Sequence, residues 1–231
     1  EGMELTPEQA RKLSTTLVDR LADLHEVDIE AAGLTDLGKG AGYVERQITG
    51  WTSRYRAAMT DDITAETRAH GDLTMDWLAA HLPDDVATTV IHNDFRFDNL
   101  VLDADDPTQI VAVLDWEMAT LGDPLMDLGG TMAYWVTDDD DEFFRQFRRQ
   151  PTNLPGMFSR AEFVERYCAA MGFEMTPEAW RFYEVYGLFR LAGISQQIYY
   201  RYFHGQTSNE AYARFGPAAT YLLARCAQIL A

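Results

Sequence analysis

The stretch His-Asn-Asp-Phe-Arg-Phe-Asp-Asn at residues 92–99 decides how this chain of 231 residues is interpreted. An apolar run at 88–91 precedes it, and a second apolar run at 99–102 follows it. A third run, at 110–114, ends directly before Asp-Trp-Glu at 115–117. Short apolar runs bounded by turn-forming residues predict β-strands. The polar residues therefore lie on loops at strand ends, where a rigid scaffold displays functional groups.

The side chains of these two loops suit a magnesium–nucleotide site. Mg²⁺ prefers octahedral oxygen coordination and binds through one or two protein carboxylates or amide carbonyls, while phosphates supply further ligands. A separate carboxylate must hold an acceptor hydroxyl in line with the γ-phosphorus. Asp94, Asn99 and Asp115 offer this set of groups. The spacing His-x-Asp-x4-Asn followed by an Asp also has the layout of the kinase catalytic loop and its metal-binding aspartate, so it favours a small-molecule kinase.

Helical patterns dominate the rest of the chain. Capping residues, such as the Thr6-Pro7 start and the Ser159 capping box, mark several helix beginnings. Helices are predicted over 7–25, 43–59, 64–82, 124–135, 160–172 and 177–203, and from 208 onward with a kink at Gly216-Pro217. The glycine-rich loop from Gly33 to Gly42 fits neither the GxGxxG nor the P-loop spacing, so a plain connection is predicted there. The fold class is accordingly α+β and mostly α.

The formal charge of −18, from 37 acidic and 19 basic residues, excludes some partners. Nucleic acids and anionic membranes bind mainly through basic patches, so neither is expected as a partner. The same charge repels ATP, and a nucleotide site would need its own metal ions and arginines. The charge itself indicates solubility or adaptation to high salt; a preference for cationic substrates is the functional alternative. No apolar run approaches the length of a membrane span.

Two further features bear on the compartment. Cys168 and Cys226 are far apart in apolar helical segments and form no CxxC pattern, which predicts free core thiols. The segment Glu-Gly-Met-Glu at residues 1–4 has neither the basic nor the apolar region of a signal peptide. A cytoplasmic location is expected.

Motifs outside the two loops carry a resemblance to a known family. They are Leu-Ala-Asp-Leu-His at 21–25, Gly-Tyr-Val-Glu-Arg-Gln at 42–47, and the run from 115–117 through Gly-Asp-Pro-Leu-Met-Asp-Leu at 122–128. Together with residues 92–99 they resemble the aminoglycoside phosphotransferase and choline kinase-like family, over nearly the whole chain. The resemblance is greatest to the branch that includes kinase-like domains fused to some acyl-CoA dehydrogenases. It implies a protein-kinase-like C-terminal lobe with a small β-hairpin or sheet that carries the catalytic and metal loops.

The resemblance also implies roles at matching positions. Asp94 resembles the catalytic base, which accepts the proton of the acceptor hydroxyl. Asn99 and Asp115 resemble the Mg²⁺ ligands that hold the ATP or GTP cofactor. Glu117, two residues past Asp115, is expected to bind a second metal directly or through water. Arg96 is positioned to reach the γ-phosphate and offset charge in the transition state.

Three other polar residues are expected to support the loops. His92 resembles the family's structural histidine and is expected to brace the loop, with an acid–base role as the alternative. Asp127 is expected to accept backbone N–H bonds from the catalytic loop. His25 is expected to pack or form hydrogen bonds at its helix end. For Arg96, the alternative to phosphate binding is a salt bridge to Asp98 or another neighbour.

One departure from the family pattern affects the expected activity. A kinase of this family has an N-terminal lobe with a glycine-rich strand–turn–strand and a strand lysine, and nothing upstream of residue 92 supplies either. Lys12 falls in a helix and Lys39 in a loop. Residues 1–231 are therefore interpreted as the C-terminal lobe, with the nucleotide-binding lobe absent from the chain. Such a lobe alone is expected to fold, to be inactive, and to self-associate through the face that the missing lobe would cover.

Several functions remain open. The leading interpretation is transfer of the γ-phosphate of ATP or GTP to a hydroxyl of a small molecule. The alternative is a non-catalytic, kinase-derived binding or regulatory module. A carboxylate-based metal hydrolase would need His and Asp ligand clusters, which the sequence near this loop does not offer. The family's acceptors include aminoglycosides, choline, sugars and hydroxyacyl thioesters; the net charge favours a cationic acceptor, and the branch favours a hydroxyacyl-CoA-like one.

Overall fold

The computed structural model describes residues 4–231 as mostly helical, with four short strands. Residues 1–3, which belong to the segment 1–4 examined for a signal peptide, lie outside the described residues. The helices are α1 (Pro7–His25), α2 (Tyr43–Ala57), α3 (Ala65–Ala80), α4 (Pro124–Ala133), α5 (Glu142–Arg145), α6 (Arg160–Met171), α7 (Pro177–Phe203) and α8 (Phe215–Leu230). The strands are β1 (Thr89–Ile91), β2 (Leu100–Leu102), β3 (Ile110–Val113) and β4 (Thr120–Gly122).

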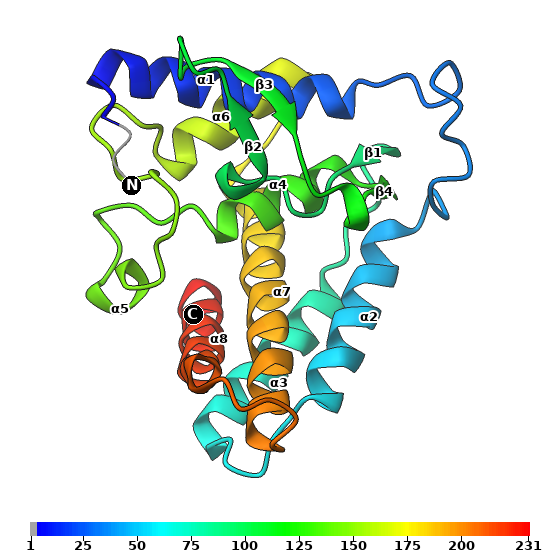
Figure 1. Cartoon of the computed structure of the whole chain (residues 1–231). Coiled ribbons are helices and arrows are strands. Elements are labelled where there is room, and N and C mark those ends of the chain that lie inside the picture. The colour runs from blue at the N-terminus through cyan, green and yellow to red at the C-terminus, as the bar shows by residue number, and fades with distance from the viewer. Residues whose placement is uncertain (1–3) are drawn as a thin grey trace.

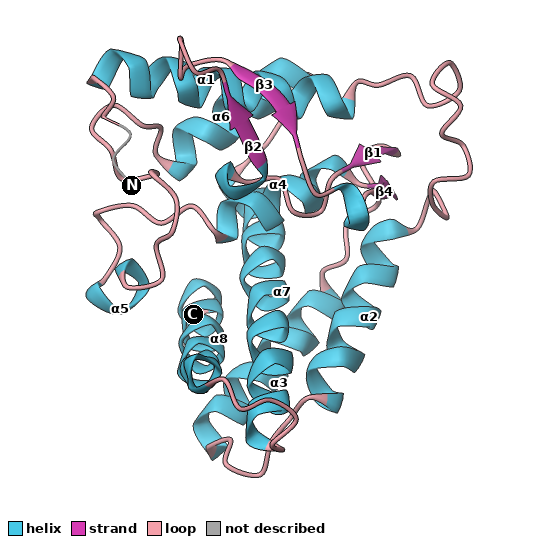
Figure 2. Cartoon of the chain, in the orientation of Figure 1, coloured by secondary structure: helices cyan, strands magenta, loops and turns pink. Residues whose placement is uncertain are grey.

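The long helix α7 is the axis of the molecule. It packs against α4, α8, α2 and α3, while α1 packs against α6. Figure 1 shows α1, α6 and the β2–β3 hairpin at one end of the molecule and α2, α3, α7 and α8 at the other, with α4 between them. All strands lie in the α1 end, as Figure 2 shows. The mostly helical α+β class predicted from the sequence is confirmed.

The strands form two antiparallel pairs and not one sheet. β1 pairs with β4, and β2 pairs with β3. The predicted strands near 88–91, 99–102 and 110–114 are present, but the prediction that these three alone carry the loops was incomplete. β4 is only Thr-Leu-Gly, too short for an alternating apolar pattern and with a glycine that disfavours strands. Its pairing with β1, about thirty residues upstream, is visible only in three dimensions.

Local capping explains where several helices begin and end. Thr6 and Gln9 form a capping box at α1, and Ser159 and Glu162 form another at α6. Gly172 ends α6 in the left-handed conformation that glycine adopts without strain. The predicted kink at Gly216-Pro217 is wrong: a 3₁₀ turn (Glu210–Arg214) precedes α8, and both residues lie in its first turn. Proline fits there because the first helical N–H groups have no partner within the helix.

Helices α4 and α7 touch through their backbones. A Cβ added at Gly187 would lie 2.1 Å from the carbonyl oxygen of Gly129, and one added at Gly129 would lie 2.5 Å from that of Tyr183. No side chain larger than hydrogen fits between the two helices at this crossing. The contact fixes the position of α4, which carries Asp127, relative to α7, which carries Arg190.

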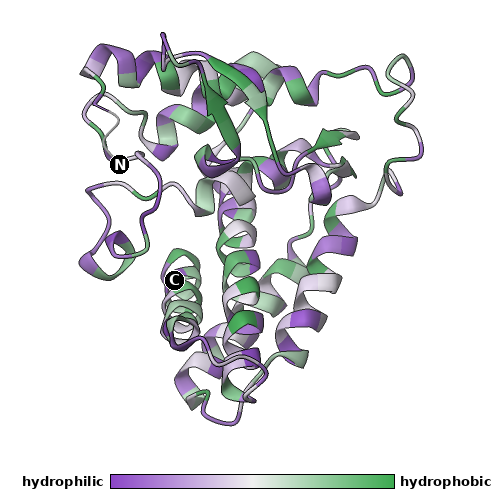
Figure 3. Cartoon of the chain, in the orientation of Figure 1, coloured by the Kyte–Doolittle hydropathy of each residue, from purple (hydrophilic) through white to green (hydrophobic). Residues whose placement is uncertain are grey.

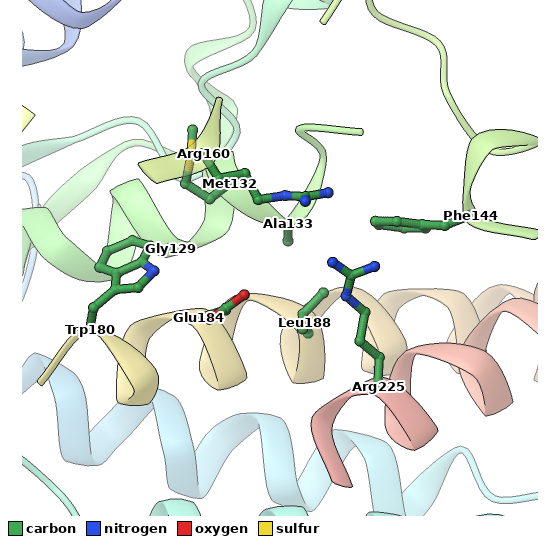
Figure 4. A pocket seen from close by; sticks show the side chains of 9 residues that line it. All are labelled: Gly129, Met132, Ala133, Phe144, Arg160, Trp180, Glu184, Leu188 and Arg225. Atoms are coloured by element: carbon green, nitrogen blue, oxygen red, sulfur yellow. The ribbon is translucent and has the colours of Figure 1, made fainter. Parts of the chain in front are cut away.

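A buried ion cluster fastens the segment after α4 to two other helices. Asp140, with a side chain only 3% exposed, lies 2.5 Å from the Arg160 guanidinium of α6 and 2.9 Å from that of Arg225 of α8. Both guanidinium groups also lie over the Phe144 ring. Figure 4 shows the two arginines converging beside Phe144. Buried charges are tolerated when an opposite charge neutralises them. Loss of the Asp140 carboxylate would therefore leave the guanidinium groups of Arg160 and Arg225 without their partner.

The connection between α1 and α2 is a long loop, as predicted. Gly38 within it packs against β4, because a Cβ there would lie 2.7 Å from the backbone nitrogen of Leu121. The glycine is therefore explained by a close backbone approach. Among the described helices none combines the length and the apolar character that a membrane crossing requires.

Candidate active site

Strand pairing brings the two functional loops side by side. The segment 92–99 connects β1 to β2, and the segment 114–119 connects β3 to β4. Because β1 pairs with β4 and β2 pairs with β3, both ends of one loop lie next to both ends of the other. A backbone hydrogen bond of 2.7 Å from the Leu114 nitrogen to the Asn99 carbonyl oxygen joins the two loops.

Asp127 supports the catalytic loop from below. Its carboxylate is 1% exposed and accepts hydrogen bonds of 2.8 Å from the backbone nitrogens of His92 and Asn93. The His25 Nε2 lies 3.1 Å from the same carboxylate, and the His25 Nδ1 lies 2.6 Å from the Tyr167 hydroxyl. Burial alone would raise the pKa of Asp127, but the hydrogen bonds from His25 and from the His92 backbone outweigh it and lower that pKa. The carboxylate therefore stays ionised and holds the start of the loop.

His92 connects the two loops. It is fully buried; its Nε2 lies 2.9 Å from the Leu114 carbonyl, and its Nδ1 lies 3.2 Å from the Asp94 backbone nitrogen. The carbonyl can only accept and the backbone N–H can only donate, so the ring is the neutral tautomer protonated at Nε2. Its ring also packs against Trp116, with centroids 4.8 Å apart. Both ring nitrogens are thus committed to backbone groups, which fits the bracing role better than acid–base chemistry.

Asp94 and Asn99 form a close pair. The Asn99 amide nitrogen donates to the Asp94 carboxylate at 2.8 Å and to the Asp94 carbonyl at 2.8 Å. Both donors of the amide group point at Asp94, so the amide oxygen of Asn99 remains for another ligand. Asn99 is buried, whereas Asp94 is partly exposed. The pair combines a carboxylate that can face a substrate with an amide oxygen that can face a cation.

Asn93, just before Asp94, has the left-handed conformation with φ of 65°. Tyr43 donates from its hydroxyl to the Asn93 side-chain oxygen at 2.8 Å, and Arg190 donates to the Asn93 carbonyl at 2.7 Å. Arg190 is 4% exposed, and its guanidinium also lies over the Trp51 ring. Asparagine tolerates this conformation better than most residues, and the surrounding contacts hold it there.

Arg96 is already paired. Its Nη1 lies 3.0 Å from the Asp98 carboxylate, and its guanidinium lies over the Tyr134 ring. Its Nε lies 3.1 Å from the Asp94 carboxylate, an ion-pair distance, yet the N–H is not aimed at that oxygen and makes no hydrogen bond. The salt bridge to Asp98 expected as the alternative is therefore formed. The contact with Asp94 also keeps a cation beside the proposed catalytic carboxylate.

The second loop is open to solvent. Asp115 is the other non-glycine residue in the described chain with a positive φ, at 64°, and it and Glu117 are both exposed. Within residues 4–231 neither carboxylate has a hydrogen bond or an ion pair. Large apolar side chains surround the loop on the exposed surface. They are Val101, Val111, Leu114, Trp116 and Met118, 37–58% exposed, and we call this set the apolar rim. Figure 3 shows hydrophobic colour along β2 and β3, which carry part of it.

These donors fit a magnesium ion better than they fit a hydrolase centre. An amide oxygen and a free carboxylate on adjacent loops are the hard oxygen ligands that Mg²⁺ takes, with phosphates and water completing the shell. No group of three or more His, Cys, Asp or Glu within residues 4–231 is arranged to hold a metal.

Asp123 is a further buried carboxylate beneath the site. It caps α4, accepting from the backbone nitrogens of Leu125 and Met126, and it also accepts from that of Val86 at 2.7 Å. Burial raises its pKa to about 6, although the three N–H donors act in the opposite direction. Sequence reasoning treated this residue as a helix start and missed its long-range contact with Val86.

Tyr43 and Arg190 are the supporting residues that sequence reasoning missed. Both were assigned to helices, and their contacts with Asn93 span 50 and 97 residues. A weak signal existed for Arg190, which is a lone charged residue in the apolar run Gly187–Gly193. Buried arginines are rare unless they have a partner.

Comparisons with known proteins agree with this architecture. Residues 1–163 match the family model described as the phosphotransferase enzyme family. Acyl-CoA dehydrogenase family member 10 of Mus musculus is 36% identical over 205 residues, which cover 89% of this chain and 18% of that protein. The chain thus spans less than a fifth of that relative's length.

Solved structures share the fold. A Ralstonia eutropha protein, provisionally assigned as an aminoglycoside phosphotransferase, is 32% identical with a TM-score of 0.79, over 95% of this chain and 64% of that one. The GDP complex of aminoglycoside 2'-phosphotransferase-IIIa has a TM-score of 0.62 at 13% identity, over 95% and 64% of the two chains. By its sequence match, and in agreement with its fold, this chain belongs to the phosphotransferase enzyme family.

Proposed function

We propose that this chain carries the catalytic loop of an enzyme that moves the γ-phosphate of ATP or GTP to a hydroxyl of a small molecule. Membership of the phosphotransferase family supports the general reaction. The GDP bound to a protein of the same fold is consistent with a purine nucleotide. The observation that carries the proposal is the Asp94–Asn99 pair, joined through Leu114 to the loop that bears Asp115.

Each residue has a distinct part in the proposed reaction. Asp94 orients the acceptor hydroxyl and accepts its proton as the new oxygen–phosphorus bond forms, while the bond from the γ-phosphorus to the bridging oxygen breaks and the nucleoside diphosphate leaves. Asn99 and Asp115 would hold Mg²⁺, and Glu117 would hold a second ion directly or through water. Bound Mg²⁺ neutralises phosphate charge. Arg96 balances the charge of Asp94 in the resting site and would contact the transferred phosphoryl group during the reaction.

The nucleotide requires more contacts than these residues supply. Between residues 4 and 88 the chain forms helices and loops, and both lysines lie outside the site, Lys12 in α1 and Lys39 in the α1–α2 loop. We propose that residues 1–231 are the C-terminal lobe and that a nucleotide-binding lobe of the same protein covers the apolar rim. Burial of these side chains would favour such docking by roughly 25 cal/mol per Å². Self-association through the same rim is the competing outcome.

A non-catalytic binding module is the second candidate. The Arg96–Asp94 ion pair favours it, because a substrate hydroxyl must approach the same carboxylate. For the enzyme, the cytoplasm is the proposed location, since it supplies ATP and keeps thiols such as the buried Cys168 and Cys226 reduced.

The test uses the chain joined to its nucleotide-binding lobe. Asp94→Ala should lower kcat by roughly 10²–10⁴-fold with little change in nucleotide affinity, because it removes the general base. Asp115→Ala should instead weaken Mg-nucleotide binding measured by calorimetry. Asp105→Ala, in the exposed β2–β3 turn, is the matched control and should alter neither quantity. Unchanged Mg-nucleotide affinity in Asp115→Ala would remove Asp115 from the metal site, and nucleotide binding without transfer to any acceptor would favour the binding module.

A further inference from the structure

A cavity of about 280 Å³ opens beside the catalytic loop. Its walls come from the end of α4, the segment 146–150, one face of α7 and the start of α8. Leu191, Ile194 and Ile198 give α7 an apolar wall. Arg96 also lines the cavity, and its Nε lies 3.1 Å from the carboxylate of Asp94, which is not itself a lining residue. An apolar cavity with a few polar groups next to a reactive side chain is the usual form of a substrate site.

The charge of this cavity is opposite to that of the molecule. Arg96, Arg149 and Arg214 line it, and no aspartate or glutamate is among its lining residues in the described chain. The whole chain, by contrast, has 37 acidic residues against 19 basic ones. Because its lining contains arginines and no acidic side chain, the cavity attracts anions locally, even though the net charge of the whole protein repels them.

Arg149 and Arg214 are the arginines available to a ligand. Arg96 is held by Asp98 and Asp94, whereas neither of the other two forms an ion pair with any residue between 4 and 231. Arg149 belongs to the segment after α5, and Arg214 to the turn that begins α8. Both side chains are exposed, so they can adjust to a ligand. A guanidinium binds a carboxylate through two parallel hydrogen bonds, which gives orientation as well as attraction.

The cavity wall is tied to the catalytic loop. Gln150 accepts a hydrogen bond of 3.1 Å from the Phe97 backbone nitrogen. The same segment follows the Asp140 cluster, which fastens it to α6 and α8. A ligand held by this wall is therefore positioned relative to Asp94, as phosphoryl transfer requires.

We propose that this cavity binds the acceptor as a hydroxyl-bearing organic anion with an apolar body. Arg149 and Arg214 hold its carboxylate, the apolar wall of α7 contacts its hydrocarbon part, and its hydroxyl reaches Asp94. The proposal rests on the phosphotransferase function above and names its substrate class. A cationic acceptor would meet the two guanidinium groups of Arg149 and Arg214, which have no ion-pair partner between residues 4 and 231, and no carboxylate among the lining residues, so the net charge of the chain does not predict its ligand.

Binding can be tested without nucleotide on the intact 231-residue chain. The probes are a straight-chain hydroxycarboxylate, the diol of the same length and the amino alcohol of the same length, each titrated by calorimetry. We expect the hydroxycarboxylate to bind at least about tenfold more tightly than the other two, since each charge-assisted contact contributes on the order of 1.5–3 kcal/mol. Equal binding of all three, preference for the amino alcohol, or binding of none would overturn the proposal.

Substitutions of Arg149 and Arg214 test whether the preference for the hydroxycarboxylate arises in this cavity. Arg149→Gln with Arg214→Gln should abolish the preference for the acid, and Arg149→Glu with Arg214→Glu should reverse it in favour of the amino alcohol. Arg201→Gln, an exposed change on α7 outside the cavity, is the matched control and should leave the preference intact. Circular dichroism of each variant establishes folding before titration. A preserved acid preference in both double variants would place the anion elsewhere.

The two proposals fail separately. If the acid binds at this cavity but the enzyme with its nucleotide-binding lobe transfers no phosphate, the phosphotransferase function fails and the anion site stands. If transfer occurs to amino alcohols or uncharged diols with equal efficiency, the reaction stands and the anionic substrate class is refuted.

Discussion

The two functional loops differ in how they are held. The loop at 92–99 is anchored from beneath by the buried Asp127 carboxylate and from the side by Arg190 and Tyr43. The loop at 114–119 leaves Asp115 and Glu117 exposed beside the apolar rim. The first is preorganised by this chain, as catalysis by positioning requires. The second loop exposes its carboxylates and the apolar rim to solvent, where the proposed nucleotide and second lobe would bind.

The largest expected effect is a difference in the free energy of unfolding between a substitution under the first loop and one in the second. Asp127→Asn keeps the side-chain volume but cannot accept both backbone N–H groups and pair with His25 equally well. We expect the free energy of unfolding to fall by about 3–5 kcal/mol, because each buried hydrogen-bond donor left unsatisfied costs about 1–3 kcal/mol, and more where a charged group is involved. The same exchange at Asp115 should change it by less than about 0.5 kcal/mol, as expected at an exposed site. Urea denaturation measures both, and similar losses in the two variants would contradict the distinction.

Asp123 gives the anchored region a pH dependence of its own. Its pKa is raised by burial to about 6, above the value of about 3.9 for an unfolded aspartate. The folded state therefore binds the proton more tightly, so this group's contribution to stability is greatest below about pH 4 and declines as the pH rises toward 6. Two pKa units correspond to about 3 kcal/mol.

The contribution of Asp127 to stability has the opposite dependence on pH. Its pKa is lowered in the folded state, so its contribution is present above about pH 4 and is lost as the pH falls through the folded value. Asp123→Asn should remove the decline between pH 4 and 6 and leave the acid-side loss. Denaturation across pH measures both slopes. An unchanged slope between pH 4 and 6 in Asp123→Asn would assign that dependence to another group.

The smallest expected effect concerns Arg190. Arg190→Met would leave the Asn93 carbonyl without its donor, at a cost of about 1–3 kcal/mol, partly offset because a buried charge is removed as well. Arg54→Met is the matched control, because Arg54 lies over the same Trp51 ring from the exposed side. Hydrogen exchange should accelerate at residues 93–95 in Arg190→Met only. Equal acceleration in both variants would show that loss of the Trp51 contact is the cause.

Much of this architecture follows from the sequence, because its signals are local. Capping boxes at Thr6 and Ser159 and the short apolar runs around 92–99 defined helices and strands within a few residues of where they lie. Long-range pairing was not predictable in the same way. β4 has three residues and its partner is β1, and Arg190 reaches Asn93 across 97 residues. The cavity lined by Arg96, Arg149 and Arg214 is likewise formed by single residues from separate segments, and these residues form no sequence motif.

The glycine contact between α4 and α7 has a consequence for how such a protein can diversify. Upstream of Arg190, α7 is locked against α4 at backbone distance, so substitutions there would displace the helix that carries Asp127. Downstream, Leu191, Ile194 and Ile198 face a cavity and have room to vary. One 27-residue helix therefore divides into a half that backbone contact with α4 constrains and a half that faces the cavity proposed to hold the acceptor. If the proposed acceptor site is correct, mutations in the second half would alter its specificity without displacing α4.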